Sequence, residues 1–527
     1  MVEYLIRDVR LPLPERDRPA LDIAARALST TPRQIHSARF VRRSIDARQG
    51  RVSFVVSVIA DLPGALAALP AGVVAAPPPP ALPALPAVSG NPEIAIVGTG
   101  PAGLFAALRL TAAGLRPVLL ERGADLTERL QDVDALQGRG VLDPESNFHF
   151  GMGGAGTYSD GKLFTRLNHP AIAFVLASLQ RHGAGSEEEI LVEAHPHVGT
   201  DRWPPTLQSL RRELEARGCR FLFHTRVTGL DLREGKLRGL TLTDGIHPCE
   251  AALLAPGNSA RELFEALSAA GVAILAKPFA VGMRMVHPQE RIDRIQYGRH
   301  AGHPLLPPAT YRLTGTFQGR GVYSFCMCPG GAVLPTPTEE GLLCLNGMSH
   351  STRSSPEANA AMVVTLSPED LDQPGDPLCG IRFQRTLERA AFVAGGGGYA
   401  APAQSLEGFL RDRSQPVPPV RCYHPRIHEA PLTGLLPPWL ETPLKEGLWS
   451  FTKKMKGLLD PQAVLLGLET RTSCPVRILR QPDGMSPTVQ GLFPAGEGSG
   501  FAGGITSSAV DGVRAADWLV QWLVSRP

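Results

Sequence analysis

A glycine fingerprint between an apolar run and a helical stretch constrains the fold of this chain more than any other feature. Residues 94–97 are continuously apolar, and Gly98, Gly100 and Gly103 follow directly in a GxGxxG arrangement. An uninterrupted apolar strand indicates a parallel sheet covered on both faces. In such a turn the first glycine permits the bend, the second lets the backbone approach a pyrophosphate, and the third packs helix on strand. The sequence therefore predicts a βαβ unit that binds a dinucleotide.

The residues after the fingerprint complete this unit. Residues 104–115 are expected to form a helix, and residues 118–120 begin the next strand. Glu121 ends that strand, close to the separation of about 20 residues at which a carboxylate meets the ribose hydroxyls. The phosphates would lie at the N-terminus of the helix, where free N–H groups and the dipole favour negative charge.

A second glycine turn lies near the C-terminus. A short strand ends near Pro494, and Gly503 and Gly504 precede a helix expected from about Ile505. This arrangement repeats the anion-binding device of a helix N-terminus. A second loop that returns to one nucleotide from the far end of the chain suits FAD better than a mobile NAD. Residues 251–261, which include Gly257, supply a third strand-to-glycine crossing of the same sheet.

Composition excludes several other classes of protein. The chain has 527 residues, 43% hydrophobic and 20% charged, with a formal net charge of +3, so neither disorder nor a nucleic-acid partner is indicated. Its eight cysteines form neither a disulfide framework nor a zinc pattern, and we expect no metal. No apolar run reaches the length of about 18 residues needed for a membrane span. The start of the chain lacks the apolar segment of a signal peptide, so we expect a cytoplasmic protein without membrane contact.

Changes in composition along the chain divide it into parts. Proline and alanine dominate residues 76–92, which favours an extended linker. The fold class we expect is α/β, an FAD-binding Rossmann-like domain with a central parallel sheet, an inserted α+β substrate domain and a small N-terminal α+β domain. The expected parts are the N-terminal domain (1–75), the linker (76–92), the first part of the FAD-binding domain (93–270), the inserted domain (271–470) and the C-terminal part of the FAD-binding domain (471–527).

The motifs together resemble a known group of flavoproteins. The chain is similar to the glutathione-reductase type, and within it to a bacterial and plastid group of FAD-dependent dehydrogenases of unknown substrate. The segments that carry the resemblance include "IVGTGPAGLFAA", "FGMGGAGTYSDGKL", "CMCPGGAV" and "GLFPAGEGSGFAGGITSSAVDG". One departure is Cys474, where serine is commoner in such chains.

The resemblance implies bound FAD and assigns residues to its parts. Those at the pyrophosphate would be Gly98, Gly100, Ala102 and Gly103; Glu121 would bind the ribose, Arg122 would flank the adenosine and Val227 would touch the adenine. Those along the ribityl chain and flavin ring would be Gly496, Glu497, Gly504, Ile505 and Thr506. We add Gly257 and Gly503 from the glycine turns described above.

The stretch from Phe150 to Leu163 contains five glycines together with Tyr158, Asp160 and Lys162. In flavoproteins of this type such a loop lies against the flavin, where side chains would collide. The glycines that would permit this approach are Gly151, Gly153, Gly154 and Gly156, and we count Gly153 and Gly154 among the cofactor-binding residues. Lys162 is a catalytic candidate, because a positive charge stabilises a reduced anionic flavin. A mobile linker and a solvated surface lysine remain the alternatives.

Residues 271–470 contain strand-like runs of their own and are expected to cover the flavin. Polar residues on or beside these runs are Arg284, His287, Tyr323, Asn346, Ser349 and Arg353. A structural role is the commoner one for each of them; Arg353 is our catalytic candidate. No second Rossmann fingerprint is present to hold NAD(P)H firmly, so NAD(P)H is considered only as a transient electron donor.

Cys326 and Cys328 are separated by one residue on an expected strand. We expect their sulfur atoms to point to opposite faces of the strand, so that only one could face the flavin. Simple packing is the favoured reading, since cysteine is often buried. If either thiol is catalytic, we expect it to be Cys326.

These inferences predict an FAD-dependent oxidoreductase that moves a hydride, or two electrons, between an unidentified small organic substrate and the flavin. A flavin monooxygenase is one alternative. A second is a flavin-bearing redox protein without catalysis, in which residues 1–75 dock a protein partner.

Overall fold

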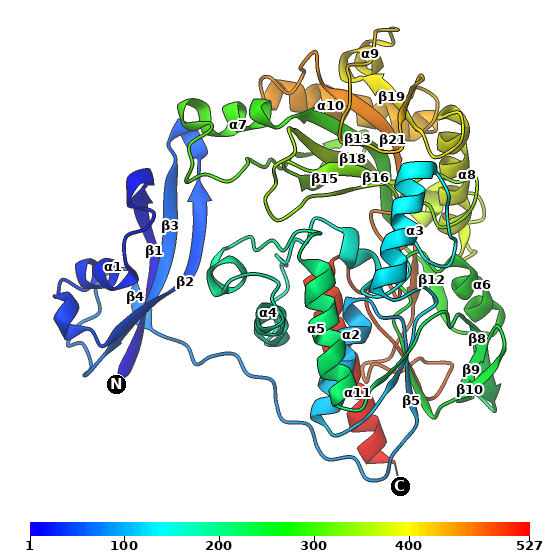
Figure 1. Ribbon diagram of the computed structural model, residues 1–527, viewed down its shortest axis with the longest axis horizontal. Helices are drawn as coiled ribbons and strands as arrows, with labels where there is room; N and C mark the ends of the chain where they lie inside the picture. The colour runs from blue at the N-terminus through cyan, green and yellow to red at the C-terminus, as the bar shows by residue number, and fades with distance from the viewer. Residues whose placement is uncertain (527) are drawn as a thin grey trace.

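A five-stranded parallel sheet forms the centre of the body of the molecule, in the computed structural model that describes residues 1–526 (Figure 1). The sheet has the order β23-β11-β5-β6-β7, and each neighbouring pair is parallel. Its strands are β5 (Ile94–Val97), β6 (Val118–Leu120), β7 (Arg220–Leu222), β11 (Ala251–Leu254) and β23 (Leu492–Pro494). Strands from both ends of the chain therefore share one sheet, which confirms the predicted Rossmann-like fold.

Helices cover one face of this sheet. They are α2 (Pro101–Ala112), α4 (Ala171–Arg181), α5 (Trp203–Ala216) and α11 (Ile505–Ser525), and their apolar side chains share one core with β5 and β11. Helix α2 begins three residues before the predicted start at 104, because proline is well suited to the first helical position.

The opposite face carries a small antiparallel sheet and one helix. The sheet consists of β8 (Val227–Arg233), β9 (Lys236–Leu242) and β10 (Gly245–Pro248), and the helix is α6 (Arg261–Ala269). All four residues of β5 are buried, as the apolar run predicted for a strand covered on both sides.

A seven-stranded sheet forms a cap above the parallel sheet (Figure 1). Its order is β14-β15-β18-β13-β21-β19-β20, and only the pair β19–β20 is parallel. The strands are β13 (Phe279–Pro288), β14 (Thr314–Phe317), β15 (Arg320–Cys328), β18 (Glu357–Leu366), β19 (Ala401–Ser405), β20 (Ile427–Glu429) and β21 (Val464–Glu469).

The remaining elements surround or connect these two sheets. The helices are α3 (Leu126–Arg139), α7 (Gln289–Tyr297), α8 (Cys379–Ala394), α9 (Leu406–Arg411) and α10 (Pro438–Lys454). Two further strand pairs are β12 (Ile274–Ala276) with β22 (Val476–Ile478), and β16 (Ala332–Pro335) with β17 (Leu345–Met348).

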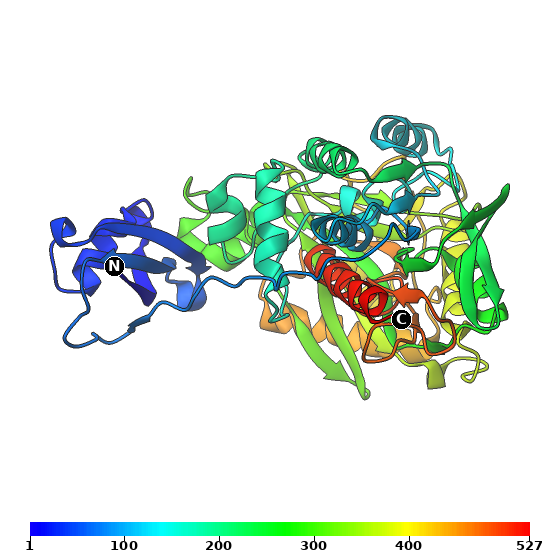
Figure 2. The same ribbon diagram turned by 90° about the horizontal axis from the view of Figure 1, so that it is seen from below.

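The N-terminal residues form a separate sheet of order β2-β3-β1-β4 that carries helix α1 (Figure 2). Its elements are β1 (Val2–Pro12), α1 (Ala20–Ala27), β2 (Ser37–Asp46), β3 (Ser53–Leu62) and β4 (Val73–Ala75). We call residues 1–75 the arm. The arm touches the body, since Arg43 pairs with Glu188 and Glu193, and Ala194 N–H donates to the Arg43 carbonyl at 2.8 Å.

The proline-rich linker is extended but is not a free spacer. It returns along the body beside α11 (Figure 2), and Leu82, Leu85 and Val88 pack against the core to which α2 and α11 contribute. Arg109 of α2 also donates to the carbonyl of Pro83 at 2.6 Å. Within residues 1–526, no helix is long and apolar enough to cross a membrane.

Candidate active site

Two uncapped helix N-termini lie at the carboxyl edge of the parallel sheet. Helix α2 begins after Gly100 and helix α11 after Gly504, and neither first turn receives a side-chain cap. The first N–H groups of a helix have no partner within the helix, and the dipole makes this end attractive to anions. The edge therefore offers two phosphate-binding ends in the position expected for a dinucleotide.

The glycines at this edge are of two kinds. A Cβ on Gly98 would lie 2.4 Å from the carbonyl oxygen of Ala255, and one on Gly103 would lie 2.0 Å from that of Gly98. A Cβ on Gly100, Gly257 or Gly503 would meet no atom within 4 Å. The first two glycines are required by the packing of the chain itself, whereas the other three border open space. Open space beside two uncapped helices fits a bound FAD.

Glu121 is buried at the end of β6 and is fully engaged with the protein. Its Oε2 accepts from Thr99 N–H at 3.0 Å and Thr99 Oγ1 at 2.7 Å, and its Oε1 accepts from Gly123 N–H at 3.1 Å and Gly151 N–H at 2.9 Å. A carboxylate offers about four acceptor positions. Glu121 thus fixes the loops that shape the site, and its contact with a ribose stays a prediction.

The residues predicted for the adenosine end lie near the same strand. Arg122 binds Glu145 and Glu262, and its guanidinium lies 3.9 Å above the ring of Phe150. Val227 begins β8 and is buried in the core that also contains Phe150. Both side chains are therefore held in place by the protein.

The glycine-rich stretch lies across the first turns of both helices. A Cβ on Gly154 would lie 3.1 Å from the Cα of Gly100, and one on Gly156 would lie 3.4 Å from Pro101 and 3.5 Å from Ile505. The hydroxyl of Thr506 donates to the carbonyl of Leu163 at 2.7 Å, which ties the end of the stretch to α11. The stretch is an ordered wall of the site.

The reason for its glycines differs from the one inferred from the sequence. A Cβ on Gly151 would lie 2.4 Å from Arg129, and one on Gly153 would lie 2.3 Å from Thr157 and 2.4 Å from Leu207. The packing of the chain already requires both glycines. Contact of Gly153 and Gly154 with the flavin stays a prediction.

Beside α11, the loop after β23 contains a buried carboxyl group. Glu497 accepts from the amide of Asn258 at 2.8 Å, and burial raises the pKa of Glu497 to about 7. Gly496 lies opposite Ala102, because a Cβ there would come within 2.8 Å of the Cβ of Ala102. Ala102 of the first motif and Gly496 and Glu497 of the C-terminal motif are thus brought to the same edge of the sheet.

One buried nitrogen atom near this edge has no partner in the protein. His149 Nδ1 lies 3.1 Å from Ser259 Oγ, while its Nε2 makes no hydrogen bond within the described residues. Burial lowers the pKa of His149, so the ring is neutral and retains a hydrogen-bonding position for a ligand.

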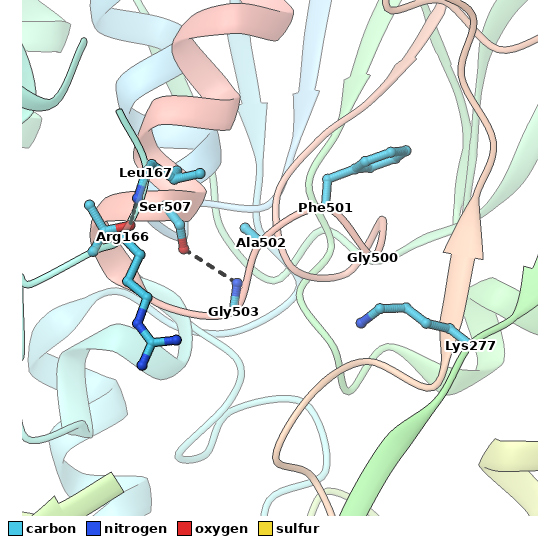
Figure 3. A pocket seen from close by; sticks show the side chains of 9 residues that line it. Arg166, Leu167, Lys277, Gly500, Phe501, Ala502, Gly503 and Ser507 are labelled. Atoms are coloured by element: carbon cyan, nitrogen blue, oxygen red, sulfur yellow. Dashed lines mark hydrogen bonds between the residues drawn. The ribbon is translucent and has the colours of Figure 1, made fainter. Parts of the chain in front are cut away.

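An open cavity of about 390 Å³ lies at the start of α11 (Figure 3). Arg166 lies on one side of it and Lys277 on the other, and Gly503 N–H donates to the Ser507 hydroxyl at 3.3 Å between them. Burial lowers the pKa of Lys277. Two basic side chains therefore border the opening to solvent.

A charged cluster lies where the glycine-rich stretch meets the cap. Asp160 is buried and accepts a hydrogen bond from Ser349, while Lys162 pairs with Asp160 and donates to the carbonyl of Met327. His197 Nε2 lies 3.4 Å from Asp160. Burial opposes ionisation of Asp160, yet Lys162, His197 and Arg353 lower its pKa. Lys162 and Arg353, both predicted as catalytic, therefore act on one carboxylate.

A second buried pair lies on the cap sheet next to this cluster. Arg284 of β13 is fully buried, and its Nε donates to Glu469 at 2.7 Å. Its Nη1 donates to Asn359 at 2.7 Å and to the carbonyl of Cys326 at 3.1 Å. Burial raises the pKa of Glu469 to about 7, although Arg284 opposes the shift.

The inference from spacing that the two cysteine sulfurs point to opposite faces is wrong. Phe325 pairs with Ala361 and Cys328 pairs with Asn359, so β15 has one extra residue there, a β-bulge. Cys326 takes a positive φ of 43° in this bulge. Regular alternation would place residues two apart on one face, and the bulge interrupts it, so spacing alone does not determine where the Cys326 side chain points. Cys328, Lys162 and Arg284 all lower the pKa of Cys326, so its thiol lies near the charged cluster.

Sequence reasoning did not single out Asp160, His197, Glu469, Asn359 or His149 as site residues. A usable signal was present only for Asp160, because it stands two residues before Lys162 in an otherwise glycine-rich stretch. The other four reach the site from positions that show no spacing pattern.

Comparison with known proteins identifies the family. Residues 278–472 match the family described as FAD-dependent protein, C-terminal domain-like, and residues 96–167 match an NAD(P)-binding Rossmann-like domain. An uncharacterized protein of Clostridium beijerinckii is 43% identical over 444 residues, which cover 82% of each chain. The chain belongs to the FAD-dependent oxidoreductase family. This confirms the resemblance inferred from the motifs and makes the protein an FAD-dependent enzyme.

Residues 5–61 of this flavoprotein also match a domain of unknown function. Similarities to solved structures are more distant. Glycine oxidase from Bacillus cereus is 10% identical, with a TM-score of 0.35 over 82% of this chain and 95% of the other. A glycerol-3-phosphate dehydrogenase from Bacillus halodurans complexed with FAD is 12% identical, with a TM-score of 0.33 over 84% and 66% of the two chains.

Proposed function

We propose that this FAD-dependent oxidoreductase is a dehydrogenase that passes two electrons between a small organic substrate and its flavin. The observation that carries the proposal is the arrangement of the glycine-rich stretch. Its middle, at Gly154 and Gly156, covers the first turns of α2 and α11, and its end is tied to α11 and places Lys162 beneath the cap sheet. The bound FAD supplies the electron-carrying ring, and the chain supplies position and charge.

The proposal gives each open region of the sheet edge one part of the cofactor. The N–H groups that follow Gly100 would hold the pyrophosphate, with Gly98 and Gly103 fixing the turn. Gly257, Gly496 and Glu497 would border the ribityl chain. The first turn of α11, with Gly503, Gly504, Ile505 and Thr506, would direct its positive end toward the ring. Glu121, Arg122 and Val227 would form the adenosine end.

Lys162 and Asp160 would act as a charge pair at the reacting end of the site. Asp160 is held ionised by its neighbours, and it keeps the ammonium group of Lys162 in a fixed place. A fixed positive charge stabilises negative charge that develops on substrate or cofactor. Arg353 would strengthen this field, and Cys326 would lie at the edge of the same cluster.

The electron donor, the location and the partners belong to the same proposal. NAD(P)H would serve as a transient donor, entering without a second nucleotide-binding domain. The protein would act in the cytoplasm on a small molecule, and the arm would select a substrate or dock a protein partner.

The test is anaerobic mixing of the purified yellow protein with NADH, NADPH and a panel of metabolites, while the flavin absorbance is followed. Bleaching by one compound identifies the donor. The Lys162→Met variant, with FAD still bound, should bleach about 100-fold more slowly, a loss typical of one electrostatic contact in the transition state. Equal rates in the two proteins would contradict the role of Lys162, and oxygen consumption with a hydroxylated product would identify a monooxygenase instead.

A further inference from the structure

The open cavity at the start of α11 is bordered by basic groups to which the proposed function gives no role (Figure 3). Its volume is about 390 Å³. A cavity of about 150 Å³ already holds a benzene molecule, so the space suffices for a small organic ligand. Among the residues that the structure describes, no acidic side chain lines the cavity. The cavity therefore suits a ligand that carries negative charge.

Lys277 contributes a half-buried ammonium group, and Figure 3 shows its side chain extending into the cavity from the side opposite Arg166. Its Nζ donates to the carbonyl of Cys474 at 3.4 Å and forms no ion pair with any residue from 1 to 526. An ammonium group has three donor positions, and burying a charge is costly unless it is paired. Burial lowers the pKa of Lys277, and Arg477 adds to the shift. Lys277 thus has unused donors and lacks the anion that would stabilise its charge.

The opposite side of the cavity adds a second cation. Arg166 is exposed, and its guanidinium makes neither a hydrogen bond nor an ion pair within the part of the chain that the structure describes. Helix α11 begins at this cavity without a side-chain cap, so the positive end of its dipole adds to the two charges. The charged groups around the opening that are free to take a partner are therefore all positive.

Apolar side chains distinguish the cavity from a plain phosphate site. Leu167, Phe501 and Ala502 belong to its lining. The Phe501 ring is held in place by Arg480, whose guanidinium lies 3.6 Å from the ring centre and which pairs with Asp511 at 2.7 Å. A carbon skeleton gains by covering such groups, whereas an inorganic anion does not. The lining therefore favours a carboxylate that is attached to an apolar body.

We propose that the cavity binds the carboxylate of the substrate, so that the enzyme acts on a small organic acid. Lys277 would hold the carboxylate, Arg166 would attract it from the solvent side, and Phe501 and Leu167 would contact its carbon skeleton. The inference rests on the proposed function, because the first turn of α11 also borders the position given there to the flavin ring. The rival reading is that the cofactor itself fills the cavity.

The first test asks whether an organic acid reaches Lys277 in the purified holoprotein. The protein is treated briefly with acetic anhydride, and acetylation of each lysine is measured by mass spectrometry in the presence of benzoate, benzamide or inorganic phosphate. Benzamide has the shape of benzoate without its charge, and phosphate has the charge without a carbon skeleton. At about ten times its dissociation constant, benzoate should slow acetylation of Lys277 about tenfold, because only the free fraction reacts. Benzamide and phosphate should protect far less, and the exposed Lys236 should react equally in all samples.

Variants measure what each cation contributes, by calorimetric titration with benzoate. Lys277→Met should weaken binding about 30-fold, since a hydrogen bond between charged groups is lost, and Lys277→Arg should retain most of the affinity. Arg166→Met should weaken binding about threefold, because an exposed charge is screened by water. Lys236→Met is the matched control and should bind benzoate like the wild type. Benzoate should also shift the visible absorbance of the bound FAD if the cavity lies beside the ring.

These measurements separate the inference from the dehydrogenase proposal. Protection of Lys277 by benzoate supports the acid site even if no metabolite bleaches the flavin. Three results would overturn the inference: equal protection by phosphate and benzoate, unchanged benzoate affinity in a folded, yellow Lys277→Met protein, and bleaching by a neutral metabolite when benzoate protects nothing. Lys277 that resists acetylation in the holoprotein without any added anion would show that the cofactor fills the cavity, which would also overturn it.

Discussion

The first turn of α2 and the end of β15 both leave regular geometry beside the candidate site, but for different reasons. At the turn, Gly98 has a φ of 96°. The residues packed closely against it, Gly103 and Ala255, belong to the same sheet edge. At β15 the irregular residue is Cys326, which has a side chain and the same unfavourable sign of φ. Its conformation is held by β18, Arg284 and Lys162, which come from three other parts of the chain.

The difference shows where local sequence determines structure and where distant contacts do. Glycine enters a positive φ without a steric penalty, so its position in a motif reports the turn directly. A cysteine in that conformation carries no such signal, because neighbours far along the chain stabilise it. Variants at the two places should therefore lose different properties, and the largest loss is expected at the glycine turn.

The largest effect should come from Gly103→Ala. The added Cβ would lie 2.0 Å from the backbone oxygen of Gly98, which cannot move without opening the turn. We expect the free energy of unfolding to fall by about 3 kcal/mol or more, at the upper end of overpacking effects. Chemical denaturation of the FAD-free protein measures this loss without the cofactor.

Gly100→Ala is the matched control three residues away. Its φ of −71° suits alanine and its Cβ would meet no protein atom within 4 Å. The unfolding free energy should change by less than about 0.5 kcal/mol, while FAD retention should fall by about tenfold. Equal destabilisation by both variants would contradict the division into packing and ligand glycines.

On the cap side, Lys162→Met should destabilise the folded chain by about 2 kcal/mol at neutral pH, because Asp160 loses its charged partner while buried. The pKa of Asp160 is lowered in the folded protein, so its stabilisation is present above about pH 4 and lost as the pH falls. The difference between the two proteins should therefore shrink in acid.

Unfolding curves at several pH values measure this effect, and the double variant Lys162→Met with Asp160→Asn is the control. The neutral amide removes the unpaired charge, so the double variant should recover part of the loss. If the double variant loses as much as the sum of the single ones, the two residues are not coupled.

The contrast also explains how much the sequence could predict. The parallel sheet and the two glycine turns follow from apolar runs and glycine spacing, and both were correctly predicted. The direction in which Cys326 points could not be predicted, because a bulge residue interrupts the regular alternation of the strand. Arg284 and Glu469 can be recognised from the sequence as polar residues on strands. Their ion pair joins β13 and β21, and it could not be predicted because the two residues are 185 positions apart in the sequence.

The fingerprint also predicted more for Glu121 than its geometry supports. Position at the end of β6 identified it, yet its acceptor positions are filled by Thr99, Gly123 and Gly151. A motif gives the place of a residue, while its free hydrogen-bonding capacity depends on the loops folded around it.

A smaller effect is expected from Glu497→Gln. Burial raises the pKa of Glu497 to about 7, with Asn258 and Lys277 opposing the shift, so the side chain ionises as the pH rises through neutrality. If it borders the ribityl chain, as proposed, its new negative charge adds to that of the adjoining pyrophosphate and should weaken FAD binding by about tenfold between about pH 6 and about pH 8, one pKa unit of coupling. The glutamine variant should retain FAD equally at both values, as measured by ultrafiltration. A wild-type protein without this pH dependence would remove Glu497 from the cofactor's surroundings.

The smallest effect on the site should come from Arg43→Ala, which tests distant contacts at the periphery. Arg43 is buried between the arm and the body, where it pairs with Glu188 and Glu193, and its carbonyl accepts from Ala194 whatever the side chain is. Both glutamates are partly exposed and become hydrated when the guanidinium is removed, so the loss should stay near 1 kcal/mol. The arm should then detach more often, and limited proteolysis within residues 76–92 should become faster while FAD retention stays unchanged. Arg42→Ala, one residue away, is the matched control and should not alter cleavage. Loss of FAD in the Arg43 variant would show that the arm supports the cofactor site. The cofactor site would then depend on contacts with the most distant part of the chain as well as on its own glycine turns.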